Sequence, residues 1–128
     1  MTNLRKTLVL SAIMALSVLG GVANADPSGK WRVVFDHWAE ADGERVLRIA
    51  PVTGDPIDVT TKIPKGMTEN DVATLVTGAI KASVGKAYKV EVDDGEDVII
   101  KKAGKTPKFE LTMVSSSVTG LNVKIKRS

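Results

Sequence analysis

A single run with helical spacing, residues 69–84, is set among segments whose apolar residues alternate with polar ones. Val72, Val76 and Ile80 recur every fourth residue in this run and so fall on one face of a helix. Thr68 precedes the run in an N-cap position, because its hydroxyl can accept an otherwise unpaired backbone N–H. A lone amphipathic helix cannot bury its own stripe, so it must cover the apolar face of the strands around it.

The segments around the helix have the period of two that is typical of strands with one buried face. In residues 57–63, for example, Ile57 and Val59 share one face while Asp58 and Lys62 share the other. The remaining alternating segments are 31–35, 45–50, 88–92, 98–101, 109–114 and 121–126. The sequence therefore predicts an α+β fold, with one amphipathic helix at about 69–84 packed on a mostly antiparallel sheet of about six to seven strands.

The amino-terminal 25 residues have the order of a secretory signal peptide. Two cationic residues precede an apolar, uncharged stretch at 8–23, and Ala23-Asn24-Ala25 supplies small residues at the positions that signal peptidase reads. A spanning helix needs about 20 apolar residues, which is more than this stretch offers. We therefore expect cleavage after Ala25, an exported protein in the periplasm or outside the cell, and one globular α+β domain over 26–128.

The chain contains no cysteine. For an exported protein this excludes both disulfide bonds and thiol chemistry, so stability has to come from packing. The residues after the predicted signal peptide are numerous enough to bury a core without such covalent links.

The only histidine, His37, lies beside Trp38 in the acidic segment "VVFDHWAEADGER", residues 33–45. A metal site needs several converging ligands, and no second histidine or cysteine can join His37. Asp42-Gly43 is instead a strong signal for a two-residue β-hairpin turn, which would pair the strands on either side of it. We expect no catalytic residue, no cofactor and no metal site here; the alternative is a small exported hydrolase that uses His37 with a neighbouring acid, in which case His37 and Trp38 would be functional.

The acidic stretch "VDDGED", residues 92–97, predicts a second hairpin rather than an ion site. It lacks the alternating ligands and the later glutamate of a calcium-binding loop. Gly95 suits the left-handed position of a three-residue loop, which would pair Val92 with Glu96 and Val90 with Val98.

Charge is unevenly distributed along the chain. Residues 26–100 carry nine Lys and Arg against fourteen Asp and Glu, whereas residues 101–128 carry seven against one. The simplest interpretation is that alternate residues of two terminal strands face water; the alternative is a cationic face that adsorbs to anionic envelope polymers. Nucleic acid is disfavoured as a partner, because stacking needs exposed aromatic side chains and Phe109 is the only aromatic residue after position 100. The candidate residues for an anionic partner are Lys101, Lys102, Lys105, Lys108, Lys124, Lys126 and Arg127.

Part of the chain resembles a small module of phage tail-sheath proteins and flagellar hook-associated (flagellin IN-type) proteins. The matching pieces are "IDVTTKIPKGMTENDVATLVTGAI", "YKVEV" and "DVIIKKAGK". The resemblance implies a β-β-α-β-β fold and a non-catalytic role. It does not imply a place in a virion or flagellum, because Lys81 stands where that group has Asn and those proteins generally have no cleaved secretion signal.

Taken together, these features predict a small exported, non-catalytic domain that binds or assembles in the bacterial cell envelope or the extracellular space. Such a domain would use an exposed strand edge or an apolar patch to pair with a protein partner or with a second copy of itself. No apolar stretch after the predicted signal peptide is long enough to span a membrane.

Overall fold

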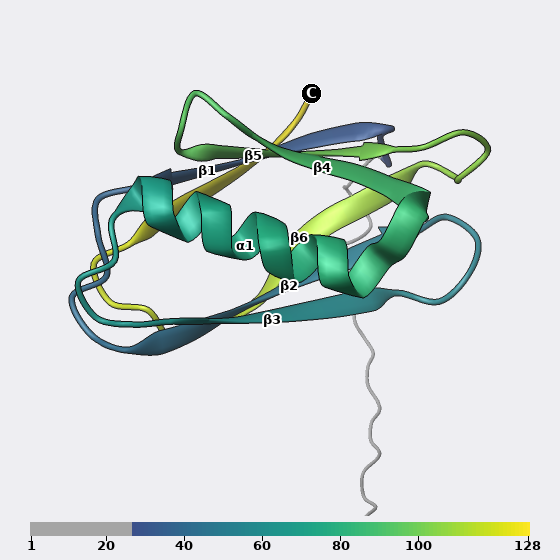
Figure 1. The fold of residues 1–128 in the computed structure, drawn as a ribbon. Helices are drawn as coiled ribbons and strands as arrows, with labels where there is room; N and C mark the ends of the chain where they lie inside the picture. Colours follow the sequence, from purple (N-terminus) through teal and green to yellow (C-terminus); the bar gives the residue numbers. More distant parts are fainter. Residues whose placement is uncertain (1–26) are drawn as a thin grey trace, which may run out of the picture.

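The fold was taken from a computed structural model of the chain, which describes residues 27–128 (Figure 1). The predicted signal peptide, 1–25, lies outside the described residues. The elements are β1 (Lys30–Asp36), β2 (Gly43–Pro51), β3 (Ile57–Ile63), α1 (Glu69–Val84), a 3₁₀ turn (Gly85–Ala87), β4 (Tyr88–Asp93), β5 (Asp97–Lys102), β6 (Phe109–Ser116) and β7 (Asn122–Arg127). The α+β class is confirmed, and α1 has the bounds that the sequence predicted.

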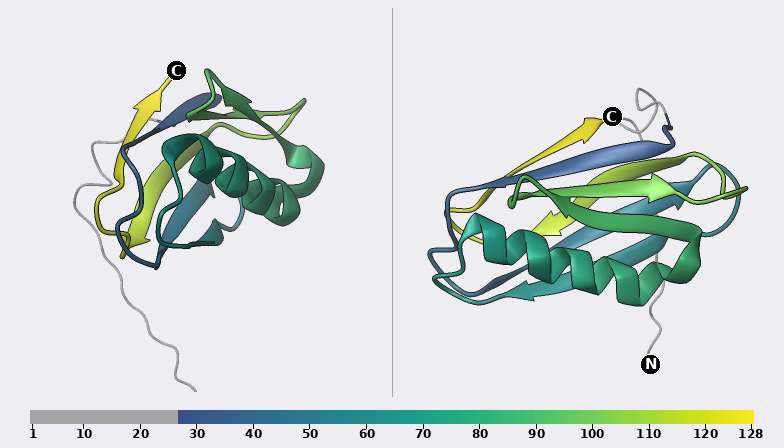
Figure 2. Two further views of the ribbon diagram at one scale, coloured as in Figure 1. Left: turned by 60° about the vertical axis from the view of Figure 1, so that its left-hand side comes forward. Right: turned by 45° about the horizontal axis from the view of Figure 1, so that its top comes forward.

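The strands form two antiparallel sheets rather than the single sheet that we expected. One sheet has four strands in the order β4-β5-β1-β7, and the other has three in the order β3-β2-β6. The sheets form two layers, and α1 lies along one side of them, where it packs against β3 of one sheet and β4 of the other (Figures 1 and 2). The helix therefore closes the gap between two sheet edges instead of covering one sheet face.

The core lies between the two sheets and the helix. Val33 and Phe35 of β1, Ile49 of β2, and Val76 and Ile80 of α1 are all at most 1% exposed. Each comes from the apolar stripe of its own element, which is why the alternating and helical patterns identified these positions in advance. Burying each such side chain contributes about 1.5–3 kcal/mol, so packing alone can stabilise a domain of this size without disulfides.

The predicted hairpin at Asp42-Gly43 is wrong. β1 pairs with β5 and β7, while β2 pairs with β3 and β6, so residues 37–42 cross from one sheet to the other. A two-residue turn would have paired odd-numbered residues of β1 with even-numbered residues of β2. The apolar faces of the two strands, both odd-numbered, would then have pointed to opposite sides of one sheet. Placing the two strands in different layers lets both apolar faces point into the same core.

The turn between β4 and β5 is a hairpin, but its register differs from the predicted one by two residues. Val92 pairs with Val98 and Val90 pairs with Ile100. Asp94 and Gly95 have φ values of 53° and 79°, so the left-handed positions begin one residue earlier than we expected. A shift of two residues keeps every side chain on its face, and the buried positions therefore stay the same.

Candidate functional site

Three lysines lie side by side on the outer face of the four-stranded sheet. Lys101 on β5 is directly opposite Lys89 on β4 and directly opposite Lys30 on β1. We call these three residues the lysine row. Directly opposite side chains on neighbouring strands have Cβ atoms about 4.5–5.5 Å apart, and like charges at that spacing are destabilising. The buried residues on the other face of these strands make the core, so nothing in the packing requires lysine at these positions.

The last strand extends this positive surface. Lys126 on β7 is opposite Arg32 on β1, and Lys124 is opposite Val34, on the same face as the lysine row. Both β7 lysines are exposed. We call the lysine row together with Lys124 and Lys126 the cationic face.

The structure divides the seven candidate residues of the sequence analysis. Lys101, Lys124 and Lys126 come together on the cationic face. Lys105 and Lys108 lie in the connection between β5 and β6. Lys102 and Arg127 lie near the strand ends at positions that alternate with those of the cationic face, and their register partners are Tyr88 and Trp31 respectively.

Lys30 and Lys89 belong to the cationic face, yet the charge count of the terminal segment missed them. They precede residue 101 in the sequence, and only the pairing of β1 and β4 with β5 places them beside Lys101. Only a correct register between β1, β4 and β5 could have identified Lys30 and Lys89 as neighbours of Lys101.

An open hollow of about 920 Å³ lies where the lysine row meets the carboxyl end of α1. Four lysines line it, one each from α1, the 3₁₀ turn, β4 and β5: Lys81, Lys86, Lys89 and Lys101. None of the four lies within ion-pair distance of a carboxylate among residues 27–128. We call this feature the lysine hollow.

Less strongly charged residues complete the lining of the lysine hollow. Tyr88, Val90 and Glu91 of β4 contribute to its wall. Burial raises the pKa of Tyr88, so its hydroxyl stays protonated at neutral pH and can donate a hydrogen bond. The hollow thus offers four positive charges against the one negative charge of Glu91, together with a neutral donor and apolar surface, which suit an anionic or mixed anionic and aromatic group.

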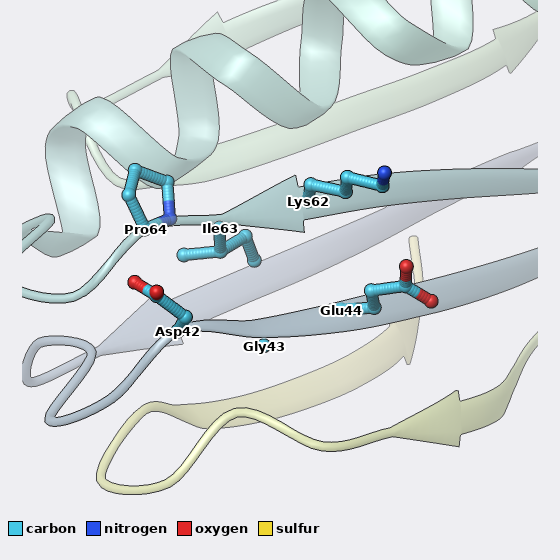
Figure 3. A pocket seen from close by; sticks show the side chains of 6 residues that line it. All are labelled: Asp42, Gly43, Glu44, Lys62, Ile63 and Pro64. Carbon is cyan, nitrogen blue, oxygen red and sulfur yellow. The ribbon is translucent and has the colours of Figure 1, made fainter.

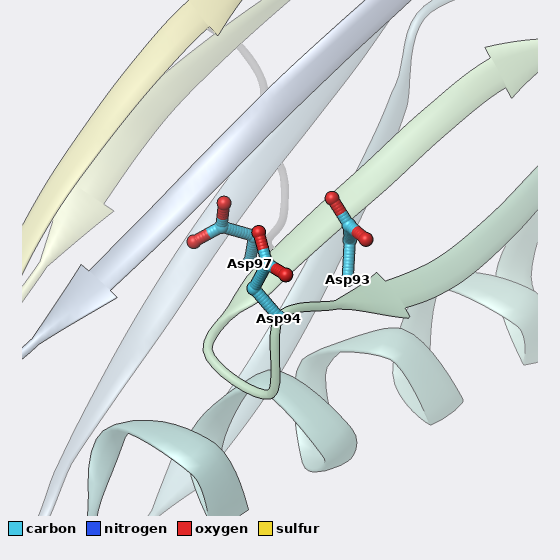
Figure 4. Close-up of side chains that lie close together, drawn as sticks. All are labelled: Asp93, Asp94 and Asp97. Atoms are coloured by element: carbon cyan, nitrogen blue, oxygen red, sulfur yellow. The ribbon is translucent and has the colours of Figure 1, made fainter.

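Three aspartates lie close together at the opposite end of the same sheet. Carboxylate oxygens of Asp93, Asp94 and Asp97 all lie within 4.8 Å of one another (Figure 4). Arg32 binds two of them, with Nη1 3.0 Å from Asp93 Oδ2 and in hydrogen-bonding contact with Asp97. Its hydrogen bonds with Asp97 and Asp93 raise the pKa of Arg32. The cluster is therefore an ion-pair network that ties the β4–β5 turn to β1.

A smaller open hollow of about 440 Å³ lies between the ends of β2 and β3 (Figure 3). Its lining mixes both signs of charge, because Lys62 pairs across the strands with Glu44. Asp42, also in the lining, accepts a hydrogen bond of 2.7 Å from the backbone N–H of Lys65. The Asp42 carboxylate is thus already held by the backbone, and a lining of mixed charge favours neither sign of ligand.

His37 and Trp38 lie in the segment that crosses between the sheets. The His37 side chain is 54% exposed, and its Nε2 is 3.8 Å from Asp36 Oδ2. The backbone N–H of His37 donates to Glu69 Oε2 at 2.8 Å, and its φ of 69° turns the chain toward the second sheet. His37 lines neither of the two hollows above, nor a third of about 500 Å³ that includes Asp36 and Glu96. The geometry gives His37 a place at a corner of the backbone.

No protein-family model and no curated protein matches the chain. The resemblance to tail-sheath and hook-associated modules stays a prediction. No helix within residues 27–128 has both the length and the apolar character needed to cross a membrane.

Proposed function

We propose that this chain is a small exported, non-catalytic binding domain and that its ligand is an anionic polymer of the cell envelope or the extracellular space, bearing phosphate or carboxylate groups. The lysine row carries this proposal. It combines like charges on three neighbouring strands with a lack of carboxylate partners within residues 27–128.

The lysine row opposes folding, because its like charges repel one another. Two residues of unlike charge that face each other across neighbouring strands stabilise a sheet by about 0.2–1 kcal/mol, whereas two of like charge in the same positions destabilise it. A bound polyanion would remove this repulsion, because it supplies the negative charges that the sheet itself lacks. The cationic face and the adjoining lysine hollow together could hold several consecutive charges of an extended chain.

The alternative of a hydrolase that uses His37 draws little support from the geometry. The His37 side chain is more than half exposed and lines none of the three hollows. Catalysis by a histidine and an acid would need a cleft in which a substrate reaches both groups.

Export to the periplasm or beyond rests on the amino-terminal pattern at 1–25. Fractionation of producing cells, followed by amino-terminal sequencing of the exported form, tests it. We expect a chain that begins at Asp26. A protein that stays in the cytoplasm with Met1 intact would contradict the export proposal.

Binding of the purified protein to inorganic polyphosphate tests the ligand class. We expect the double variant Lys89→Glu/Lys101→Glu to bind at least about tenfold more weakly than the wild type, since two attractive charges become repulsive. The matched control is Lys62→Glu/Lys65→Glu, which makes the same change in net charge outside the cationic face and should bind within about threefold of the wild type.

Equal losses in both double variants would contradict the proposal, because net charge rather than the cationic face would then govern binding. Affinity that does not fall with added salt would also contradict it, since contacts between exposed charges are screened. Circular dichroism melts of each variant separate a loss of binding from a loss of folding.

A further inference from the structure

Three elements around the lysine hollow, α1, β4 and β5, each carry acidic residues toward one end of the molecule and lysine toward the other. β4 runs from Lys89 to Asp93, the antiparallel strand β5 runs from Asp97 to Lys101, and α1 begins at Glu69. Because the strand directions alternate, the acidic residues of these three elements gather at one end of the molecule and their lysines at the other. In Figure 1 the acidic end is on the left, with the start of α1 and the β4–β5 turn, and the lysine end is on the right.

The carboxylates at the acidic end are close enough to affect one another. Burial and the nearby charges of Glu69, Asp97, Asp36 and Asp94 raise the pKa of Glu96. Five acidic residues from β1, α1, β5 and the β4–β5 turn thus surround one small region of the surface. Among these five, Asp97 alone pairs with an arginine, Arg32, and His37 lies near Asp36, so most of the negative charge there is not balanced by an ion pair within residues 27–128.

A large aromatic side chain stands out from this acidic end. Trp38 is 55% exposed, and it forms an isolated β-bridge with Thr68, the residue that precedes Glu69. The neighbouring His37 donates its backbone N–H to Glu69, which fixes this carboxylate beside the segment that carries Trp38. Exposed tryptophans are common among the residues that dominate protein–protein binding.

The lysine end offers the complement of this arrangement. Its hollow of about 920 Å³ is lined by Lys81, Lys86, Lys89 and Lys101 around Tyr88 and Val90. A tryptophan in the hollow could pack on Tyr88 and Val90, and the lysines could contact the ring face in cation–π geometry. The carboxylates around Trp38 would then meet the lysines around the hollow.

We propose that two copies of this chain associate head to tail, with Trp38 and the acidic end of one copy docked in the lysine hollow of the next. The two surfaces are different, so the contact is heterologous and each added copy leaves one free surface of each kind. Such contacts build a ring if the rotation closes and an open filament if it does not. This inference goes beyond the proposed function, and it uses the lysine hollow for a second partner, so polyphosphate should compete with association.

Sedimentation velocity of the purified protein over a range of concentrations tests the proposal. We expect the wild type to associate with rising concentration at about 20 mM salt and to dissociate at about 500 mM salt. Trp38→Ala should weaken association by about tenfold or more, and its exposed position makes loss of folding a poor explanation for that result.

Reversal of charge at each end gives the sharper test. Lys86→Glu/Lys89→Glu removes the positive excess of the hollow, and Asp94→Lys/Glu96→Lys removes the negative excess of the acidic end, so each double variant alone should stay monomeric at every concentration. An equal mixture of the two should associate again, because the intact acidic end of the first variant meets the intact lysine hollow of the second. A wild type that is monomeric at low salt, or two folded variants that fail to associate when mixed, would overturn the proposal.

Polyphosphate binding separates this inference from the proposed function. Asp94→Lys/Glu96→Lys should lose self-association but still bind polyphosphate, since neither residue belongs to the cationic face. A monomeric wild type that binds polyphosphate would overturn the head-to-tail contact alone. A wild type that associates but does not bind polyphosphate would overturn the proposed ligand alone.

Discussion

Charged residues are arranged differently on the outer faces of the two sheets. On the three-stranded sheet, Arg48 Nε lies 2.7 Å from Asp58 Oδ1 across the β2–β3 pair, and Glu44 is opposite Lys62. On the four-stranded sheet, lysine is opposite lysine at one end, and Asp93 is opposite Asp97 at the other. Opposite charges lie across from each other on the three-stranded sheet, whereas like charges lie across from each other on the four-stranded sheet.

The difference teaches that the segregated charge is not a by-product of the fold. Both sheets are antiparallel, and both bury one face in the same core. The three-stranded sheet shows that opposite charges can be placed across neighbouring strands of this chain. Arg32 bridges the two aspartates of the four-stranded sheet, but its lysine row has no such compensation within residues 27–128, which is the pattern expected where a surface is shaped by a partner rather than by stability.

The largest expected difference in stability between variants of the two outer faces concerns an apolar residue that charged side chains cover. Ile99 is on the outer face, opposite Arg32 and Glu91, yet it is only 5% exposed, so neighbouring side chains cover it. Ile99→Ala should lower the free energy of unfolding by about 2 kcal/mol, as at a buried site. Its counterpart on the central strand of the other sheet, Val46, is half-buried, and Val46→Ala should cost about 1 kcal/mol or less.

Urea denaturation of both variants checks this difference. Equal losses for Ile99→Ala and Val46→Ala would mean that the charged side chains do not form a closed cover over Ile99. The cationic face would then be looser than the geometry indicates.

Reversing one lysine on each outer face should change stability in opposite directions. Lys101→Glu places a negative charge between Lys89 and Lys30 and should raise the free energy of unfolding by about 0.5 kcal/mol. Lys62→Glu places two glutamates opposite each other, because Glu44 is its partner, and should lower it by about 0.5 kcal/mol. Chemical denaturation at low salt gives the largest signal, since the difference should shrink as salt is added. A loss of stability in Lys101→Glu would show that the lysine row does not strain the sheet.

The smallest expected effect concerns two glutamates with raised pKa values, one associated with each sheet. For Glu96 the causes are burial first and then neighbouring carboxylates, whereas burial alone raises the pKa of Glu110 on β6. A carboxyl group with a raised pKa in the folded state favours folding when protonated and opposes it when ionised. Its unfavourable contribution is therefore complete above the folded-state pKa and disappears as the pH falls below 4.5, the ordinary value.

Glu96→Gln and Glu110→Gln should accordingly both stabilise the protein at pH 7 and have little effect below pH 4.5. Salt should reduce the gain from Glu96→Gln, because it screens the neighbouring carboxylates, and should leave the gain from Glu110→Gln unchanged. Thermal melts at two pH values and two salt concentrations check both statements. A salt-independent gain in Glu96→Gln would remove the argument that the acidic end is electrostatically crowded.

The sequence predicts those features of this fold that depend on neighbours along the chain. The apolar stripe of α1 predicts the helix at 69–84, although Thr68 stands at the N-cap without the expected side-chain hydrogen bond, and alternation indicates which side of each strand faces the core. The pairing of β1 could not be predicted, because the Asp42-Gly43 signal is local while the partners of β1, β5 and β7, lie far along the chain. Long-range packing of two apolar faces outweighed a favourable turn.

The candidate site shows the same division between local and long-range information. The composition of residues 101–128 offered a cationic surface as an alternative to lysines that simply face water, and its seven candidate residues included Lys101, Lys124 and Lys126. The lysine row needs the register between three strands, and the predicted register of β4 and β5 was two residues from the observed one. The place of Lys30 and Lys89 beside Lys101 could therefore not be predicted from the sequence.

The most direct test of the cationic face is a titration of isotopically labelled protein with inorganic polyphosphate, followed by the backbone amide signals. We expect the shifts to concentrate at Lys30, Lys89 and Lys101 and around the lysine hollow, with Arg48 and Asp58 unaffected on the other outer face. Shifts centred on the three-stranded sheet, or no shifts at low salt, would contradict the account.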